Sequence, residues 1–216
     1  SDIKYKKKYF DNNGVVIIKN LVPKEIIGKC LRELNNFKNY SLPEKKKHIV
    51  FDKYKSRKYI KYFQYLNFYV FSFNAFLNSK ILEISSILLN DKTYFHNMNY
   101  HNKIPGGSGT PPHQDNFYWC RKPKKALTAY VALNSQSNKN GGITYFLKSH
   151  KLKTFNHYYS NIKAFSSGIN SKILKKKKIY SPILFPGDVA FHHCNIIHQA
   201  SKNNHKTLER KALALT

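Results

Sequence analysis

The second half of the sequence predicts a mainly β protein, a barrel or a sandwich, with helices flanking it from the first half. From Thr93 onward, short runs rich in β-branched and aromatic residues alternate with turn residues, as in ALTAYVAL, GGITYFL, SPILFPGDVAFHH, IIHQA and RKALALT. Many short strands in series are typical of barrels and sandwiches. The 216 residues fit a single domain, 1–216, which is large enough to bury a core without help from disulfides or metals.

The first half predicts a strand followed by helices. Residues 14–20 (GVVIIKN) form an apolar run that predicts a strand, and Pro23 soon after suits the first position of a helix. From Lys24 to Phe37 the apolar residues recur at three- and four-residue spacing, which predicts an amphipathic helix. Residues 59–77 and 81–89, crowded with aromatic and aliphatic side chains, predict two more helices.

The segment 149–180 interrupts the series of predicted strands. It is polar and rich in lysine, including four consecutive lysines at 175–178, and it has little periodicity. Long segments of this kind inside a domain are often functional loops. We therefore expect an insertion that acts as a lid over the active site.

The composition bears on partners and on the compartment. The formal net charge is +27, but only four of the 38 basic residues are arginine, whereas nucleic-acid readers favour arginine for bidentate contacts. The lysine-rich mixture is what A+T-rich codons supply, and it argues against a nucleic-acid-binding module. The three cysteines are widely spaced, with no pairing or zinc-site pattern. The apolar stretches are too short to span a membrane, so we expect a cytoplasmic protein without a membrane partner.

Three residues predict a metal site. His113 and Asp115 are separated by one residue, so on a strand both side chains project from the same face. His198 lies in a later apolar run and supplies a third ligand. Two imidazoles and one carboxylate leave positions open on Fe(II), as non-haem oxygenases require. An isolated His-x-Asp is weak evidence, because such pairs are common at surfaces and turns.

The order of the motifs makes the prediction more specific. The runs PGGSGTPPHQDNFYW, ALTAYVALN, NGGITYFLKSH and FPGDVAFHHCNIIHQASKNNHKTLERKALAL resemble, in order and spacing, the phytanoyl-CoA dioxygenase-like family of 2-oxoglutarate oxygenases. The opening NGVVIIKNLVP is also similar to that family, so the resemblance extends over nearly the whole chain. It implies a double-stranded β-helix (a cupin-like jelly roll) with N-terminal helices packed on the larger sheet.

The resemblance also implies the roles of individual residues. His113, Asp115 and His198 match the iron ligands, and Arg210 matches the arginine that binds the distal carboxylate of 2-oxoglutarate, for which a planar guanidinium is suited. The spacing from His198 to Arg210 is one residue longer than is usual in the family. The assignment of Ser201 as a second co-substrate contact is therefore left open. Further candidates are Gln114, Lys103 and Asn102 for the co-substrate, and Phe117, Tyr118 and Trp119 for the substrate pocket.

Each of these further candidates has an alternative interpretation as a solvated or core residue. His192 and His193 are adjacent on a predicted strand, so they point to opposite faces and cannot both join one site. We interpret them as structural.

The sequence therefore predicts an Fe(II)- and 2-oxoglutarate-dependent dioxygenase that uses O2 to hydroxylate a C–H bond of a small molecule, with release of succinate and CO2. The lysines favour an anionic substrate. One alternative is a lysine-rich nucleic-acid-binding module, whose affinity would fall steeply with salt. Another is a cupin-like metalloenzyme that does not use 2-oxoglutarate and has no need of Arg210. The substrate and the oligomeric state are left open by the sequence.

Overall fold

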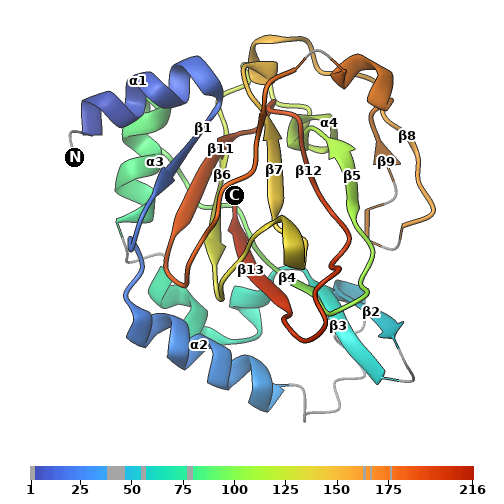
Figure 1. The fold of residues 1–216 in the computed structure, drawn as a ribbon. Helices are drawn as coiled ribbons and strands as arrows, with labels where there is room; N and C mark the ends of the chain where they lie inside the picture. The colour runs from blue at the N-terminus through green and yellow to red at the C-terminus, as the bar shows by residue number, and fades with distance from the viewer. Residues whose placement is uncertain are drawn as a thin grey trace.

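The computed structural model describes residues 3–37, 47–54, 57–76, 80–162, 164–165, 167–175 and 177–216. Two antiparallel sheets face each other in a jelly roll (Figure 1). The larger sheet has the strand order β1-β11-β6-β13-β4-β3-β2 and the smaller β10-β7-β12-β5. The strands of the larger sheet are β1 (Val15–Ile18), β2 (Ile49–Tyr54), β3 (Arg57–Phe63), β4 (Met98–Lys103), β6 (Leu127–Ala132), β11 (Val189–His193) and β13 (Arg210–Leu215). Those of the smaller are β5 (Thr110–His113), β7 (Ile143–Phe146), β10 (Ile179–Tyr180) and β12 (His198–Ala200).

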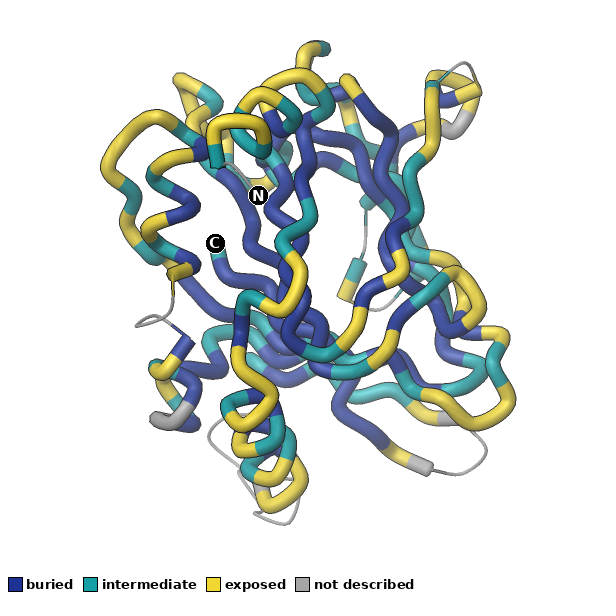
Figure 2. Tube along the Cα trace, turned by 60° about the vertical axis from the view of Figure 1, so that its left-hand side comes forward, coloured by how far each residue is buried: buried dark blue, intermediate teal, exposed yellow. Residues whose placement is uncertain are grey.

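Three helices cover the outer face of the larger sheet: α1 (Ile3–Asn13), α2 (Lys24–Phe37) and α3 (Ile81–Leu89). Their apolar faces pack with the outward side chains of the strands, for example Phe10 of α1 and Leu34 of α2 with Val131 and Leu213. Figure 2 shows the strands largely buried, while α2 keeps an exposed side. The predicted jelly roll with helices on its larger sheet is confirmed.

The two sheets enclose a second apolar cluster. Strand β6 is buried along its whole length, because alternate residues serve the two layers. Leu127, Ala129 and Val131 pack under the helices, whereas Tyr130 and Ala132 face the smaller sheet. This inner face is where the functional side chains gather.

Two of the predicted elements are wrong. Residues 59–63 belong to β3, which pairs with β2 and β4, and Leu66–Phe68 and Phe71–Phe76 form short 3-10 helices; Leu77 lies outside the described residues. Aromatic residues fit strands as well as buried helices, so the pairing with a hairpin partner decided the outcome. The strand expected to carry both His113 and Asp115 is also shorter than predicted, because β5 ends at His113 and the helical turn α4 (Asp115–Trp119) begins two residues later.

Segment 149–180 is tied to the body of the protein at both ends. Ser149 is fully buried and its hydroxyl accepts from the Ile197 amide, and β10 pairs with β7. Between them, β8 (Tyr158–Tyr159) and β9 (Ser167–Gly168) form a small hairpin beside β5. In the described parts of the chain, no helix is long and apolar enough to cross a membrane.

Candidate active site

His113, Asp115 and His198 meet at one end of the smaller sheet. Strands β5 and β12 are neighbours, and their register places His113 directly opposite His198. Gln114 has extended backbone angles (φ −119°, ψ 127°), so the side chains on either side of it project in the same direction. The alternation expected of a strand therefore holds through Gln114, and the chain turns into α4 only at Asp115.

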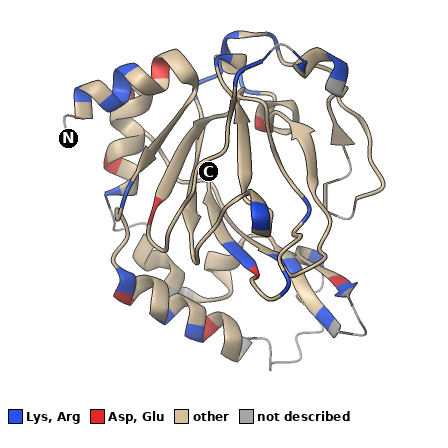
Figure 3. Ribbon diagram, in the orientation of Figure 1, with Lys and Arg blue, Asp and Glu red and all other residues tan. Residues whose placement is uncertain are grey.

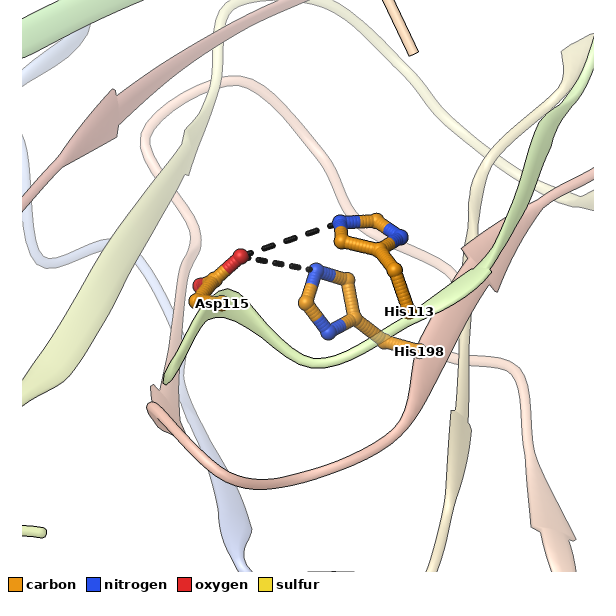
Figure 4. Close-up of side chains that lie close together, drawn as sticks. All are labelled: His113, Asp115 and His198. Carbon is orange, nitrogen blue, oxygen red and sulfur yellow. Dashed lines mark ion pairs between the residues drawn. The ribbon is translucent and has the colours of Figure 1, made fainter. Parts of the chain in front are cut away.

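The three side chains form a cluster suited to one metal ion (Figure 4). Asp115 Oδ1 lies 3.7 Å from Nε2 of both His113 and His198, and the potential ligand atoms all lie within 4.8 Å of one another. The other ring nitrogens face backbone carbonyls: His113 Nδ1 lies 2.9 Å from Pro111 O, and His198 Nδ1 lies 3.1 Å from Ile196 O. Because a carbonyl only accepts, each Nδ1 carries the hydrogen and each Nε2 keeps its lone pair for a metal.

The electrostatics favour the protonation states that a metal needs. Burial, followed by the charge of His198, lowers the pKa of His113 to about 4. Burial also lowers the pKa of His198 to about 4, although Asp115 opposes the shift. Burial alone would raise the pKa of Asp115, but the surrounding imidazoles, His198 foremost, hold it below its usual range. Neutral imidazoles and an ionised carboxylate are the forms that bind divalent metals.

Thr128 and His192 hold the other oxygen of Asp115. The Thr128 hydroxyl donates to Oδ2 at 2.9 Å, and His192 Nε2 lies 3.3 Å from the same oxygen. The Tyr145 hydroxyl in turn lies 3.1 Å from His192 Nδ1. These contacts orient Asp115 so that Oδ1 faces the two histidines.

The sequence interpretation of His192 as structural did not place it at the site, but His192 lines the cavity and contacts Asp115. His192 is 1% exposed and faces the site, while His193 points the other way and packs near Phe10 and His150. The opposite orientation of the two was correctly expected. Thr128 was missed, and the contact of His192 with Asp115 was not predicted; strand alternation on β6 and β11 was the signal that could have placed both.

Arg210 lines the same cavity as the triad His113, Asp115 and His198. This cavity has a volume of about 460 Å³, and its lining includes all three triad residues and Arg210. Arg210 is 4% exposed, at the start of β13, and its Nε donates to Gly141 O at 3.3 Å. Gly141 has φ +79°, and a Cβ there would lie 2.6 Å from Lys103 Cδ, so this close approach requires glycine.

The other predicted co-substrate residues lie outside the lining of this cavity. Gln114 is fully buried, and its side chain binds the backbone at Lys153, Phe155 and Asn195. Asn102 lies between Lys103 and His101 on β4, so its side chain faces the opposite side of the sheet. The side chains of Gln114 and Asn102 thus point away from the cavity, contrary to the prediction that they face the co-substrate.

Lys103 and Ser201 contact each other beyond Arg210. Lys103 pairs with Arg210 in the sheet register and shares its inward face. However, its Nζ donates to Ser201 O, and the Ser201 hydroxyl donates to Asn138 O. Neither residue lines the cavity, and these partners do not support their predicted direct contact with 2-oxoglutarate.

The residues of β4 that do line the cavity are His101 and Asn99. The His101 ring stacks on Phe165 with centroids 6.0 Å apart and lies 5.0 Å from the Tyr62 ring. Of the two positions predicted on this strand, Lys103 shares the inward face of His101, whereas Asn102 faces the other side of the sheet.

Two of the three predicted substrate-pocket aromatics line the cavity. Tyr118 and Trp119 do so. Phe117 instead stacks on His157 of segment 149–180, with ring centroids 4.0 Å apart. Their contact with a substrate remains a prediction.

Lys103 is expected to make the stability of the folded protein depend on pH. Burial, reinforced by the charges of Arg210 and Lys61, lowers the pKa of Lys103 to about 6, against about 10.4 in an unfolded chain. Between these values the unfolded chain binds a proton that the folded chain does not, so the free energy of unfolding rises with pH. We expect Lys103→Met to stabilise the protein relative to wild type most at pH 6 and below, with the difference shrinking toward pH 10. Urea unfolding at several pH values, with exposed Lys202→Met as the control, measures this; a pH-independent difference contradicts it.

Comparison with known proteins places the chain in a family. The family model described as phytanoyl-CoA dioxygenase (PhyH) matches residues 10–212. The fold and the site define a jelly-roll protein with two histidines and one carboxylate clustered on its inner face. The chain belongs to the phytanoyl-CoA dioxygenase family. The family resemblance expected from the sequence is confirmed.

A curated relative is a probable alpha-ketoglutarate-dependent hypophosphite dioxygenase of Stutzerimonas stutzeri, 26% identical over 145 residues, or 64% of this chain. The chain's match spans about half of that relative, 49% of its length.

Solved structures share the fold at low identity. The epimerase SnoN from nogalamycin biosynthesis aligns with a TM-score of 0.79 and 18% identity, over 99% of this chain and 81% of SnoN. EctD from S. alaskensis aligns at 0.80 and 17%, over 98% and 75% of the two chains. EvdO2 from Micromonospora carbonacea var. aurantiaca, complexed with 2-oxoglutarate, aligns at 0.75 and 15%, over 98% and 88%.

Proposed function

We propose that this protein is an Fe(II)- and 2-oxoglutarate-dependent oxygenase that hydroxylates a C–H bond of a small-molecule substrate. One observation carries the proposal: a cluster of two imidazoles and one carboxylate shares a single cavity with a buried arginine. Family membership supports the same cofactor set, Fe(II), 2-oxoglutarate and O2. The names of the relatives include an epimerase, so hydroxylation is the finer part of this proposal.

The residues fit the proposed iron. His113 and His198 would bind through Nε2, since each Nδ1 faces a carbonyl, and Asp115 through Oδ1, since Oδ2 is engaged by Thr128. With these three ligands from the protein, a bound Fe(II) would keep positions for the oxo acid and O2. When bound, iron and 2-oxoglutarate supply the oxidising power, with release of succinate and CO2. The protein's own residues hold the reactants in place and limit the access of water.

Arg210 would bind the far carboxylate of 2-oxoglutarate. Its guanidinium is buried, and it pairs in register with Lys103 on the inward face of the larger sheet. A carboxylate entering this end of the cavity would be desolvated, and it therefore requires a fixed cation. A cupin-like metalloenzyme that does not use an oxo acid would have no comparable need.

The lysines give no specific support to the nucleic-acid alternative. Figure 3 shows Lys and Arg spread over α1, α2, the loops above the sheets and the β2–β3 hairpin. Nucleic-acid binders usually concentrate such residues on one face or along one helix. A small-molecule substrate, with an anionic group that the positive field would attract, is the better supported proposal.

The test of the proposed function is the iron–keto-acid chelate. Anaerobic addition of Fe(II) and then 2-oxoglutarate should produce a weak visible absorption band, and succinate should form after air is admitted. Succinate in place of 2-oxoglutarate lacks the keto group and should give no band. Stoichiometric iron binding without any band would refute the co-substrate assignment.

We propose further that segment 149–180 covers the mouth of the active site. Phe165 and Ser167 line the cavity, and the Tyr118 hydroxyl donates to Ser167 O at 3.4 Å. Two anchors hold the flanks: the Gln114 amide donates to His157 Nε2, and the Ile169 amide to Pro112 O. In this proposal the hairpin between these anchors opens while its flanks stay attached at Pro112 and Gln114.

Chymotrypsin is expected to cut this hairpin first, because Tyr158 and Tyr159 are 63% and 82% exposed. Iron, 2-oxoglutarate and substrate should together slow the cut, since they occupy the cavity that Phe165 and Ser167 line. Cleavage at exposed Phe68 (73%), read by mass spectrometry in the same digest, is the internal control. Equal rates at Tyr159 in the bare and the loaded protein would contradict the lid.

A further inference from the structure

A second cavity adjoins the one that holds the proposed iron site. It has a volume of about 710 Å³. His96, Tyr118, Trp119 and Thr216 line both cavities, so the two share a wall at the end of α4. A ligand that occupies both cavities would therefore lie against Trp119.

The second cavity combines an apolar wall with a basic rim. The wall comes from α3 and the outer face of the larger sheet, through Leu82, Leu89, Phe95, Leu127 and Leu215. The rim carries Lys92, Arg121, Lys122 and Lys125. An apolar wall gains free energy when it is covered by an apolar group, and the cations at its edge attract an anion.

Asp91 is the acidic side chain among the described lining residues. It pairs with Lys125 at 3.0 Å, and this hydrogen bond and charge lower the pKa of Asp91. No ion pair is recorded within the described chain for Lys92, Arg121 or Lys122. The rim of the second cavity is therefore net positive, whereas His113, Asp115 and His198 line only the first cavity.

We propose that the second cavity is the distal half of the substrate site, and that it binds an elongated substrate with an apolar body and a terminal carboxylate or phosphate. The apolar body lies between α3 and Trp119, the anion lies at Lys92, Arg121 and Lys122, and the C–H bond to be oxidised lies in the first cavity beside the triad. This inference rests on the proposed function. In this proposal the cations that select the substrate are Lys92, Arg121 and Lys122, and not the lysines of segment 149–180.

Trp119 makes the proposal directly measurable, because it is the single tryptophan of the chain and lines both cavities. The protein is loaded anaerobically with Fe(II) and 2-oxoglutarate and titrated with dodecyl phosphate below its critical micelle concentration, while tryptophan fluorescence is recorded. Dodecanol has the same chain without the charge. We expect saturable binding of dodecyl phosphate that is tighter than that of dodecanol and that weakens with salt.

The variant is Lys92→Gln/Arg121→Gln, and the matched control is Lys24→Gln/Lys29→Gln on the exposed face of α2. Each exposed cation contributes about two- to fivefold at low salt, so the Kd for dodecyl phosphate should rise about tenfold in the first variant. The control should leave it unchanged, and dodecanol should bind all three proteins alike. Both altered rim residues are at the surface, so the variant is expected to fold.

The possible results separate this proposal from the proposed function. Equal binding of dodecyl phosphate and dodecanol, or an unchanged Kd in the rim variant, overturns the distal subsite while the chelate band persists. Tight, charge-dependent binding to a wild-type protein that shows no chelate band overturns the assignment of the ligand as an oxygenase substrate. Charge-dependent binding together with a normal band in both wild type and rim variant supports the proposal.

Discussion

Replacing His113 or His198 with alanine is expected to abolish the visible band of the iron–2-oxoglutarate chelate and to reduce bound iron to background. Each change removes an Nε2 lone pair that lies 3.7 Å from Asp115 Oδ1, and the two remaining groups no longer form a three-ligand face. Anaerobic absorption spectra and metal analysis of the purified variants measure the effect.

His192 provides a graded comparison in the same assay. It contacts Asp115 without belonging to the metal-ligand cluster, and loss of such an outer partner typically costs about 10- to 100-fold in metal affinity or activity. His192→Phe should therefore weaken iron binding without abolishing it. His48, which packs on Tyr65 and Tyr69 outside the cluster, gives the control His48→Ala. Full iron content and a full band in His113→Ala would show that the ligand assignment is wrong.

Replacing Arg210 with alanine is expected to leave iron binding intact and to raise the 2-oxoglutarate requirement strongly. Arg210 is 4% exposed, so a co-substrate carboxylate beside it would be buried without its partner. Truncation of one partner of a buried charge pair costs about 2–5 kcal/mol. Since each ~1.4 kcal/mol is about tenfold, the apparent KM for 2-oxoglutarate should rise by roughly tens to thousands of times. Succinate formation as a function of 2-oxoglutarate concentration measures it.

Two further variants make the Arg210 result specific. Arg210→Lys should recover only part of the loss, because an ammonium supplies charge without the paired geometry of a guanidinium. Lys211→Ala changes the next residue of β13, which faces away from the cavity and pairs with Glu209, and it should leave the KM unchanged. An unchanged 2-oxoglutarate dependence in iron-loaded Arg210→Ala would remove the co-substrate role from Arg210.

The positions of several strands in the sequence could be predicted from the local pattern of apolar and turn residues. The runs at β6, β7, β11 and β13 are bounded by turn residues and alternate or stay apolar, which strand formation requires. The amphipathic spacing of Lys24–Phe37 likewise predicted α2 correctly. These elements could be predicted because the spacing of apolar residues within each one marks the face that it buries.

The errors have a different origin. Strand β3 was mistaken for a helix because its aromatic residues fit both periods, and its place between β2 and β4 was decided by long-range pairing. Likewise, Gln114 was expected to face the co-substrate, but its amide satisfies backbone groups near residues 153–155 and 195. Buried polar groups require such partners, and no local pattern identifies a partner so far along the chain.

The family, the jelly roll with its helical cover, and the four residues His113, Asp115, His198 and Arg210 that gather in one cavity could all be predicted from the residue pattern. This is because metal and carboxylate chemistry restricts which residue types serve, and the motif preserves their order. Three features emerged only from the folded chain: His101, not Asn102, faces the cavity; His192 and Thr128 contact Asp115; and a second cavity with a basic rim adjoins Trp119. These features depend on which face of a strand meets its partners, and that face is set by pairing between segments distant in the chain.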